Sequence, residues 1–109
     1  MFVFSSPDDF LYNLVTTSPS EARKQFKQTI KDEWNNSCCY CGSKHNLSLD
    51  HVVPKVKGGS DLKNNLVCAC TSCNKDKGHS IMEDWYRNQD FFSEERLNKI
   101  KKWTNNDHP

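Results

Sequence analysis

Two pairs of cysteines in this 109-residue chain have the spacing of metal ligands. Cys38 and Cys41 form one CxxC motif, Cys70 and Cys73 form the other, and residues 42–69 lie between them. Each CxxC turn presents two thiolates from one short loop, and a Zn²⁺ ion joins two such turns in a closed tetrahedral site. The spacing therefore predicts one structural Zn²⁺ held by four cysteines. The alternatives are free buried thiols and a redox-active pair.

The other two cysteines are predicted to lie outside the zinc site. Cys39 could join Cys41 only through a CxC arrangement, which the CxxC pairing makes unnecessary. Cys68 lies in a short apolar run, where a free cysteine packs as a small hydrophobic residue.

Composition favours a small protein domain that needs an additional cross-link. Hydrophobic residues make up 35% of the chain and the mean hydropathy is −0.86, so the apolar core is modest. No apolar run approaches the ~18 residues of a membrane helix. The apolar run at the N-terminus stops after four residues and has no basic stretch, unlike a secretory signal. We therefore expect a cytoplasmic protein with no membrane partner, whose cysteines bind metal rather than form disulfides.

The formal net charge of +1 excludes a polybasic tail as the means of binding nucleic acid. Any such binding must come from local basic patches and from a bound metal ion.

The N-terminal third reads as helical scaffold. Ser6–Asp9 has a capping Ser, a Pro and two carboxylates, which predict a helix through about Thr17. Ser18–Glu21 repeats the pattern as a capping box, and the second helix is expected to run to about Asn35.

The middle of the chain predicts two short strands. Leu47–His51 alternates apolar and polar residues, and Leu66–Ala69 is apolar and leads into Cys70. Between them Pro54–Ser60 reads as a loop that turns at two glycines. A helix is expected to begin after Cys73.

The C-terminal part is predicted to be helical again. Ser80–Glu83 reads as a capping box that opens one helix, and Ser93 caps the last helix. The whole chain is thus expected to be a single α+β domain. Residues 1–36 would be an N-terminal helical scaffold, residues 37–79 the zinc-stapled core, and residues 80–109 a helical C-terminal part.

The stretch from about Arg23 to Gly78, half of the chain, resembles the HNH endonucleases, the ββα-metal nuclease family, and its specific core runs from Cys38 to Gly78. The resemblance rests on an ordered set of pieces: CxxCG, LDHVVP, a GGS turn, NNLV and CxxCNxxKG. Each piece alone is weak, whereas the set in this order and spacing is specific. It implies a ββα-metal core.

The resemblance also implies the roles of particular residues. Asp50 would bind a divalent metal ion, His51 would be the general base, and Asn65 would orient the His51 ring. Asn74 stands where many members have a second His, and would bind the metal through its amide oxygen. His79 follows Asn74 by five residues, roughly 140° further round a helix, and is therefore expected to lie outside the ligand set.

These residue types suit hydrolysis of a phosphodiester. A neutral imidazole is available near pH 7 to take a proton from water. One cation can neutralise the phosphoryl oxygens and stabilise the leaving alkoxide. Oxygen ligands from Asp50 and Asn74 suit one Mg²⁺ or Mn²⁺ ion.

Four lysines near these residues are predicted to contact DNA phosphates. Lys55 and Lys57 precede the glycine turn, and Lys75 and Lys77 follow Asn74 at the start of the expected helix.

The sequence therefore favours a metal-dependent DNA endonuclease that nicks or cuts duplex DNA with little sequence specificity. By resemblance it would leave 5′-phosphate and 3′-hydroxyl ends, and compact members of the family occur in phages, mobile elements and restriction systems. A non-catalytic zinc module that binds nucleic acid or a partner protein is one alternative, and a zinc-stapled protein acting on RNA is another. Whether a homodimer or an accessory protein is needed stays open.

Overall fold

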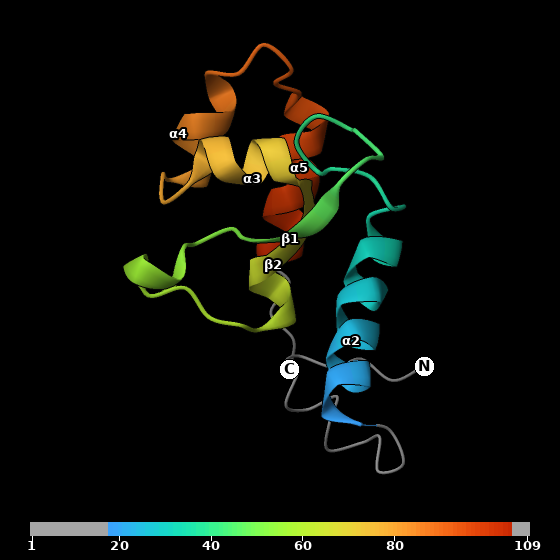
Figure 1. Ribbon diagram of the computed structural model, residues 1–109. Helices are drawn as coiled ribbons and strands as arrows, with labels where there is room; N and C mark the ends of the chain where they lie inside the picture. Colours follow the sequence, from blue (N-terminus) through green and yellow to red (C-terminus); the bar gives the residue numbers. More distant parts are fainter. Residues whose placement is uncertain (1–17, 106–109) are drawn as a thin grey trace.

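A two-stranded antiparallel sheet lies at the centre of the fold. The computed structural model describes residues 18–105. Strand β1 (Leu47–His51) pairs with strand β2 (Leu66–Cys70), and helix α2 (Pro19–Glu33) packs against both strands. Figure 1 shows α2 on one side of the hairpin and the helices after β2 on the other. This arrangement confirms the expected α+β class and is consistent with a ββα-metal core.

The pairing of the two strands fixes which side chains share a face. Leu47 lies opposite Cys70, and His51 lies opposite Leu66, with no bulge between. All five residues of β2 are buried, as a strand covered on both faces should be. β1 is only partly covered, and Asp50 is its one buried residue.

Helix α2 forms where its capping sequence predicts. The Ser18 side chain accepts a hydrogen bond from the Glu21 amide, which satisfies one free N–H of the first turn. Its apolar stripe of Ala22, Phe26 and Ile30 is buried. The helix expected up to Thr17 lies outside the described residues. No helix within residues 18–105 is long and apolar enough to cross a membrane.

Two helix starts differ from the sequence prediction. Helix α3 (Thr71–Lys77) begins before Cys73, because the Cys70 sulfur accepts a hydrogen bond from the Cys73 amide and caps the helix. Helix α4 (Met82–Arg87) has Ile81 at its N-cap and no side-chain cap. The expected capping box at Ser80–Glu83 is therefore wrong.

Helix α5 (Glu94–Thr104) is capped by Ser93, as predicted. It contacts the turn that leads into strand β2. The Trp103 indole N–H donates to the carbonyls of Lys63 and Leu66, at 3.0 and 2.9 Å. These bonds tie α5 to the short 3₁₀ turn η2 (Lys63–Asn65). The last helix thus holds the end of the loop that joins the strands.

Candidate active site and cysteine cluster

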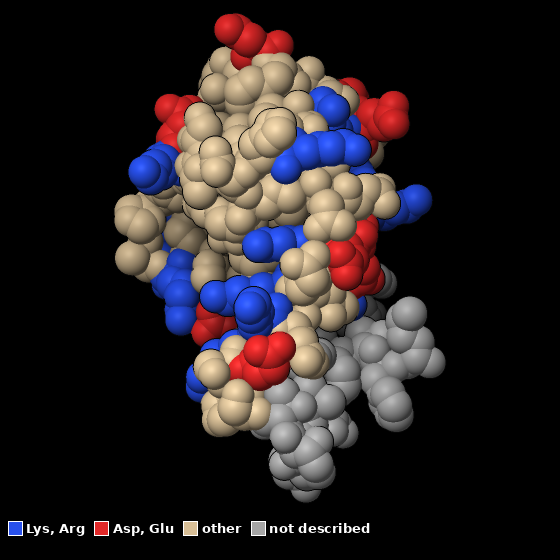
Figure 2. Space-filling model, turned by 45° about the vertical axis from the view of Figure 1, so that its right-hand side comes forward, with Lys and Arg blue, Asp and Glu red and all other residues tan. Residues whose placement is uncertain are grey.

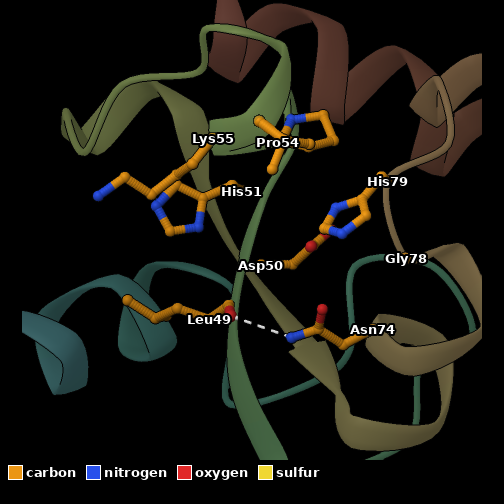
Figure 3. A pocket seen from close by; sticks show the side chains of 9 residues that line it. Leu49, Asp50, His51, Pro54, Lys55, Asn74, Gly78 and His79 are labelled. Carbon is orange, nitrogen blue, oxygen red and sulfur yellow. Dashed lines mark hydrogen bonds between the residues drawn. The ribbon is translucent and has the colours of Figure 1, made fainter.

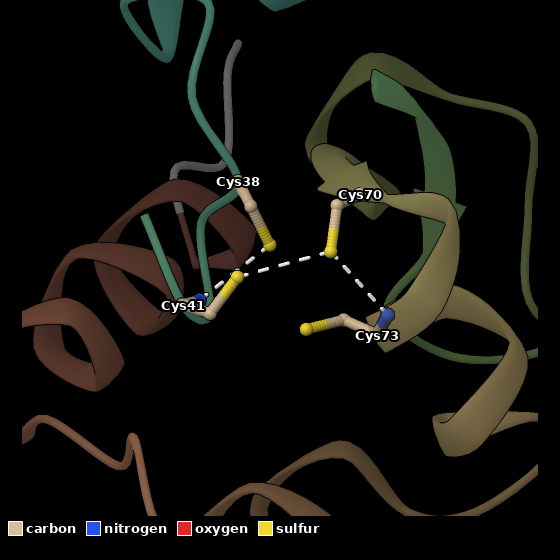
Figure 4. Close-up of side chains that lie close together, drawn as sticks. All are labelled: Cys38, Cys41, Cys70 and Cys73. Atoms are coloured by element: carbon tan, nitrogen blue, oxygen red, sulfur yellow. Dashed lines mark hydrogen bonds between the residues drawn. The ribbon is translucent and has the colours of Figure 1, made fainter. Parts of the chain in front are cut away.

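The four cysteines of the two CxxC motifs form one cluster. Their sulfur atoms all lie within 4.8 Å of one another, and Cys41 Sγ is 3.8 Å from Cys70 Sγ (Figure 4). Cys38 and Cys41 come from the turn before β1, and Cys70 and Cys73 from the junction of β2 with α3. The cluster could therefore hold one metal ion.

The surroundings of the cluster favour a bound cation. Backbone amides of Tyr40 and Cys41 donate to Cys38 Sγ, which stabilises a thiolate. Burial raises the pKa of the Cys73 thiol, and the neighbouring Cys38 sulfur raises it further. Four sulfurs held this close therefore ionise together only beside a positive charge.

Cys39 and Cys68 are not members of the cluster. Both are buried, and burial raises the pKa of Cys68 to about 11 and that of Cys39 well above its ordinary value. They remain protonated and pack in the core, in line with the sequence analysis.

Asp50 lies on the buried side of β1 and is enclosed by two donors. The Tyr40 hydroxyl donates to its Oδ2 at 2.7 Å, and the Lys77 ammonium lies 3.2 Å from the same oxygen. Lys77 reaches Oδ1 only at 3.5 Å and also donates to the His51 carbonyl at 3.0 Å. Lys77 thus balances the charge of the Asp50 carboxylate and ties this side chain to the backbone of β1 at His51.

The neighbouring His51 points to the open side of the same strand. Its Nε2 lies 2.8 Å from Asp61 Oδ1, and Lys55 lies 3.0 Å from the other oxygen of that carboxylate. The hydrogen bond to His51 lowers the pKa of Asp61, and Lys55 adds to the effect. The imidazole is therefore oriented by a charged carboxylate, an arrangement that fixes the ring and leaves Nδ1 for another partner.

Asn65 holds the loop before the second strand through hydrogen bonds to Val53 and Ser60, and none of these bonds goes to the His51 ring. The Asn65 Oδ1 accepts from the Val53 amide, and its Nδ2 donates to the carbonyls of Val53 and Ser60. A Cβ on Gly59 would lie 1.7 Å from the Val53 carbonyl oxygen, so only glycine fits there. Asn65 therefore fixes the loop that carries Asp61, and Asp61 is hydrogen-bonded to the His51 ring.

Asn74 turns its amide oxygen toward the pocket. Its Nδ2 donates to the Leu49 carbonyl and to Ser48 Oγ, and this hydrogen bonding decides which way the amide faces. Figure 3 shows its oxygen on the side of Asp50 and His79. Asn74 thus offers an oxygen ligand where the sequence analysis expects one.

These residues meet at a hollow of about 280 Å³ beside β1 and the start of the following loop. The lining includes four of the predicted site residues, which are Asp50, His51, Lys55 and Asn74. It also includes His79, which was predicted to lie outside the ligand set.

The sequence analysis placed His79 roughly 140° round the helix from Asn74. That estimate assumed that α3 continues to His79, and the structure corrects it. The helix ends at Lys77, and Gly78 turns the chain with a φ of +53°. The exposed His79 ring therefore comes back beside Asp50 (Figure 3). A glycine directly before the histidine was the available signal, since helices commonly end at such a residue.

The four lysines expected to contact DNA have different surroundings. Lys57 and Lys75 are exposed, and Lys55 is exposed beside Asp61. Lys77 must be corrected: its side chain is 0% exposed and pairs with Asp50, so no phosphate reaches it in this structure.

The segment that holds both the cluster and the pocket is similar to known proteins. A model described as HNH endonuclease matches residues 38–90, from the first cluster cysteine to just beyond α4. Residues 38–90 are an HNH endonuclease domain.

Relatives share this HNH domain. The SPbeta prophage-derived protein YoqL of Bacillus subtilis (strain 168), named as an HNH endonuclease, is 38% identical over 96 residues, covering 72% of this chain and 39% of YoqL. The CRISPR-associated endonuclease Cas9 of Corynebacterium diphtheriae is 35% identical over 78 residues, covering 68% of this chain and 7% of Cas9. The Cas9 of Actinomyces naeslundii is 38% identical over 53 residues, covering 45% and 5%. The chain thus spans about two-fifths of YoqL and under a tenth of either Cas9.

Proposed function

We propose that this chain is a metal-dependent endonuclease that hydrolyses phosphodiester bonds of DNA. The observation that carries the proposal is that Asp50, His51 and Asn74 line one pocket within an HNH domain. A base and two oxygen ligands around one open space are what water activation at a phosphate requires.

We propose Zn²⁺ as the ion of the cysteine cluster. A Zn–S bond of about 2.3 Å places sulfurs at tetrahedral corners roughly 3.8 Å apart. The Cys41–Cys70 sulfur separation of 3.8 Å fits that edge. The ion would join the turn before β1 to the start of α3, and so hold both ends of the catalytic hairpin.

A second divalent ion, Mg²⁺ or Mn²⁺, would be held in the pocket by Asp50 and Asn74. Carboxylate and amide oxygens are the ligands that such hard ions prefer. His79 faces the same space and is our candidate for a third ligand from the protein. When bound, the ion supplies charge neutralisation at the phosphate and at the leaving oxygen.

His51 would act as the general base. Its Nε2 is engaged by Asp61, so Nδ1 takes the proton of a water molecule whose oxygen attacks phosphorus. The bond from phosphorus to the 3′ oxygen breaks, and that oxygen gains a proton to become the 3′-hydroxyl. The phosphate stays on the 5′ end of the other product. Asp61 and Asn65 are positioning residues, because they act through His51.

Lys77 and Tyr40 would position Asp50 for the ion. Both contact Oδ2 more closely than Oδ1, which leaves Oδ1 as the less engaged carboxylate oxygen. Lys55, Lys57 and Lys75 stay the proposed contacts to DNA phosphates.

The test is cleavage of supercoiled plasmid by purified, zinc-loaded protein with and without Mg²⁺ or Mn²⁺. We expect nicked or linear product that requires the added metal. His51→Ala should lower the rate roughly 10²–10⁴-fold. His45→Ala, an exposed histidine outside the pocket, is the matched control and should cut like the parent. Equal cutting by His51→Ala would refute the assignment, and an RNA substrate run beside the plasmid separates the two nucleic acids.

A zinc module that binds nucleic acid without cutting it is the second candidate. The observation in its favour is the buried Lys77–Asp50 pair, in which an ammonium already neutralises the proposed metal ligand. This candidate predicts salt-dependent DNA binding with no metal-dependent product. Plasmid cleavage that is lost with His51 would eliminate it.

A further inference from the structure

A second hollow, of about 420 Å³, lies between α2 and the open side of β1. Figure 2 shows Lys and Arg side chains gathered in the lower half of the face that it brings forward, with a few acidic side chains among them. The lining residues that matter here come from α2, from β1 and from the loop beside it. They are Arg23, Lys27, Lys31, Leu49, His51 and Asp61.

Three of the four basic residues of α2, namely Arg23, Lys27 and Lys31, form a row along one face of the helix. They follow one another at intervals of four residues, which is about 6 Å per step along the axis and about 12 Å in all. One DNA strand advances about 3.4 Å of helix axis per phosphate, so about 12 Å corresponds to between three and four steps from phosphate to phosphate.

The charges of this row form no ion pair within the described part of the chain, although Lys31 acts to lower the pKa of the buried Cys68. Arg23 and Lys27 are exposed and Lys31 is half-buried. Among residues 18–105 no carboxylate forms an ion pair with any of the three. The one acidic side chain in the lining, Asp61, is already compensated by His51 and Lys55.

The hollow beside α2 adjoins the proposed active site. Leu49 and His51 line both hollows, so His51 stands between the metal pocket and the basic row. A strand whose phosphate lies at His51 must leave the site on either side. The row on α2 is the positive surface on the side away from Asn74 and His79.

We propose that the groove between α2 and β1 binds the phosphates of the DNA strand that adjoin the one cut at His51. This inference rests on the proposed function, and it concerns a helix that precedes the HNH domain of residues 38–90. It gives α2 a role in binding substrate in addition to its role in the core. Each lysine or arginine of the row contributes one salt-dependent phosphate contact.

The test measures binding of a labelled DNA duplex by fluorescence anisotropy, using the full chain with His51→Ala so that no substrate is cut. Binding constants are taken between about 50 and 200 mM salt. For the double variant Lys27→Gln and Lys31→Gln, the slope of log K against log salt should fall by about two units. The matched control is Lys24→Gln with Lys102→Gln, which removes the same charge from exposed sites outside the groove.

Equal slopes in the two double variants would overturn the inference, because bulk charge would then explain the binding. So would absence of DNA binding at the lowest salt, or equal competition by an oligoglutamate peptide of the same charge. Circular dichroism shows that the variants are folded. If the chain cuts plasmid but the two double variants show equal slopes, only the proposal of phosphate binding in the groove is refuted. If the chain binds DNA through α2 but cuts nothing, only the proposed nuclease activity is refuted.

Discussion

The two sides of strand β1 carry neighbouring residues in opposite environments. Asp50 is 4% exposed, and it forms a buried ion pair with Lys77. The side chain of His51 is 31% exposed, and its partner Asp61 is 52% exposed. Successive side chains of a strand point to opposite faces. One residue step therefore separates the buried Asp50 carboxylate from the partly exposed His51 imidazole.

The difference teaches how stability and chemistry are divided between the two sides. A buried pair costs a large desolvation free energy, so losing one partner leaves a charge that the core cannot tolerate. An exposed pair contributes little to stability, but it can orient a group that must meet water and substrate. We expect Lys77 variants to change mainly the free energy of unfolding and variants of His51 and Asp61 to change mainly the rate, whereas Asp50, as a proposed metal ligand, contributes to both.

Removal of the proposed cluster ion should have the largest effect, because the four cysteines join the turn before β1 to the start of α3. Structural Zn²⁺ contributes on the order of 10 kcal/mol or more of apparent binding free energy in small zinc domains. A strong chelator should therefore abolish the cooperative thermal transition seen by circular dichroism, and added Zn²⁺ should restore it. An unchanged transition in metal-free protein would contradict the prediction.

Breaking the buried ion pair should have the next largest effect. Lys77→Met leaves the Asp50 charge without its partner and should cost about 3–5 kcal/mol of unfolding free energy in urea titrations. Lys75→Met, on the exposed face of the same helix, should cost almost nothing. Adding Asp50→Asn to Lys77→Met should return part of the loss. If it returns none, the pair is not the cause.

A methyl group at Gly59 should disturb the loop that serves the open side. The added Cβ would collide with the Val53 carbonyl and press on Asn65, so the loop must shift. This shift should lower the free energy of unfolding by about 1–3 kcal/mol. The cleavage rate should fall with it, because Asp61 and His51 lose their alignment. Gly58→Asn is the control, since that position has open space and Asn tolerates its positive φ. Full activity in Gly59→Ala would show that the loop need not be held.

Asp61→Asn should have the smallest effect on stability and still change catalysis. The lowered pKa of Asp61 means that its stabilising contribution is present above its ordinary value of 3.8 and lost as the pH falls through the lower folded value. The pair is exposed, so urea titrations at pH 7 should barely change. The cleavage rate should drop about tenfold or more, because the imidazole loses its orienting carboxylate. A stability loss as large as that of Lys77→Met would refute the division between the two sides.

Much of the fold follows from local signals in the sequence. The Ser18 and Ser93 caps, the two strands and the four cluster cysteines are confirmed, because each depends on neighbours within a few residues or on a fixed spacing. The division into residues 1–36, 37–79 and 80–109 stays a prediction, as do the roles of the site residues.

The error at Lys77 concerns an interaction across the fold, whereas the error at the Ser80–Glu83 capping box is local. Lys77 reads as a surface lysine until the packing of α3 on β1 places it against Asp50. His79 enters the pocket only because Gly78 ends the helix, and the basic row of α2 matters only because that helix lies beside His51. The relations of Lys77 and of the basic row depend on how distant elements pack, which spacing along one chain does not contain, whereas Gly78 was a local signal for His79.

The unbroken pairing of the hairpin has a consequence for how the length of this chain can vary. One residue inserted within Leu47–His51 or Leu66–Cys70 would exchange the two faces beyond it, sending an aspartate to solvent or a histidine into the core. The stretch around Gly58 makes no such pairing. Added or missing residues there would leave both faces in place. Between the two CxxC motifs, the paired strands thus tolerate no change in length, whereas the turn around Gly58 does. Inherited insertions and deletions should therefore collect at that turn.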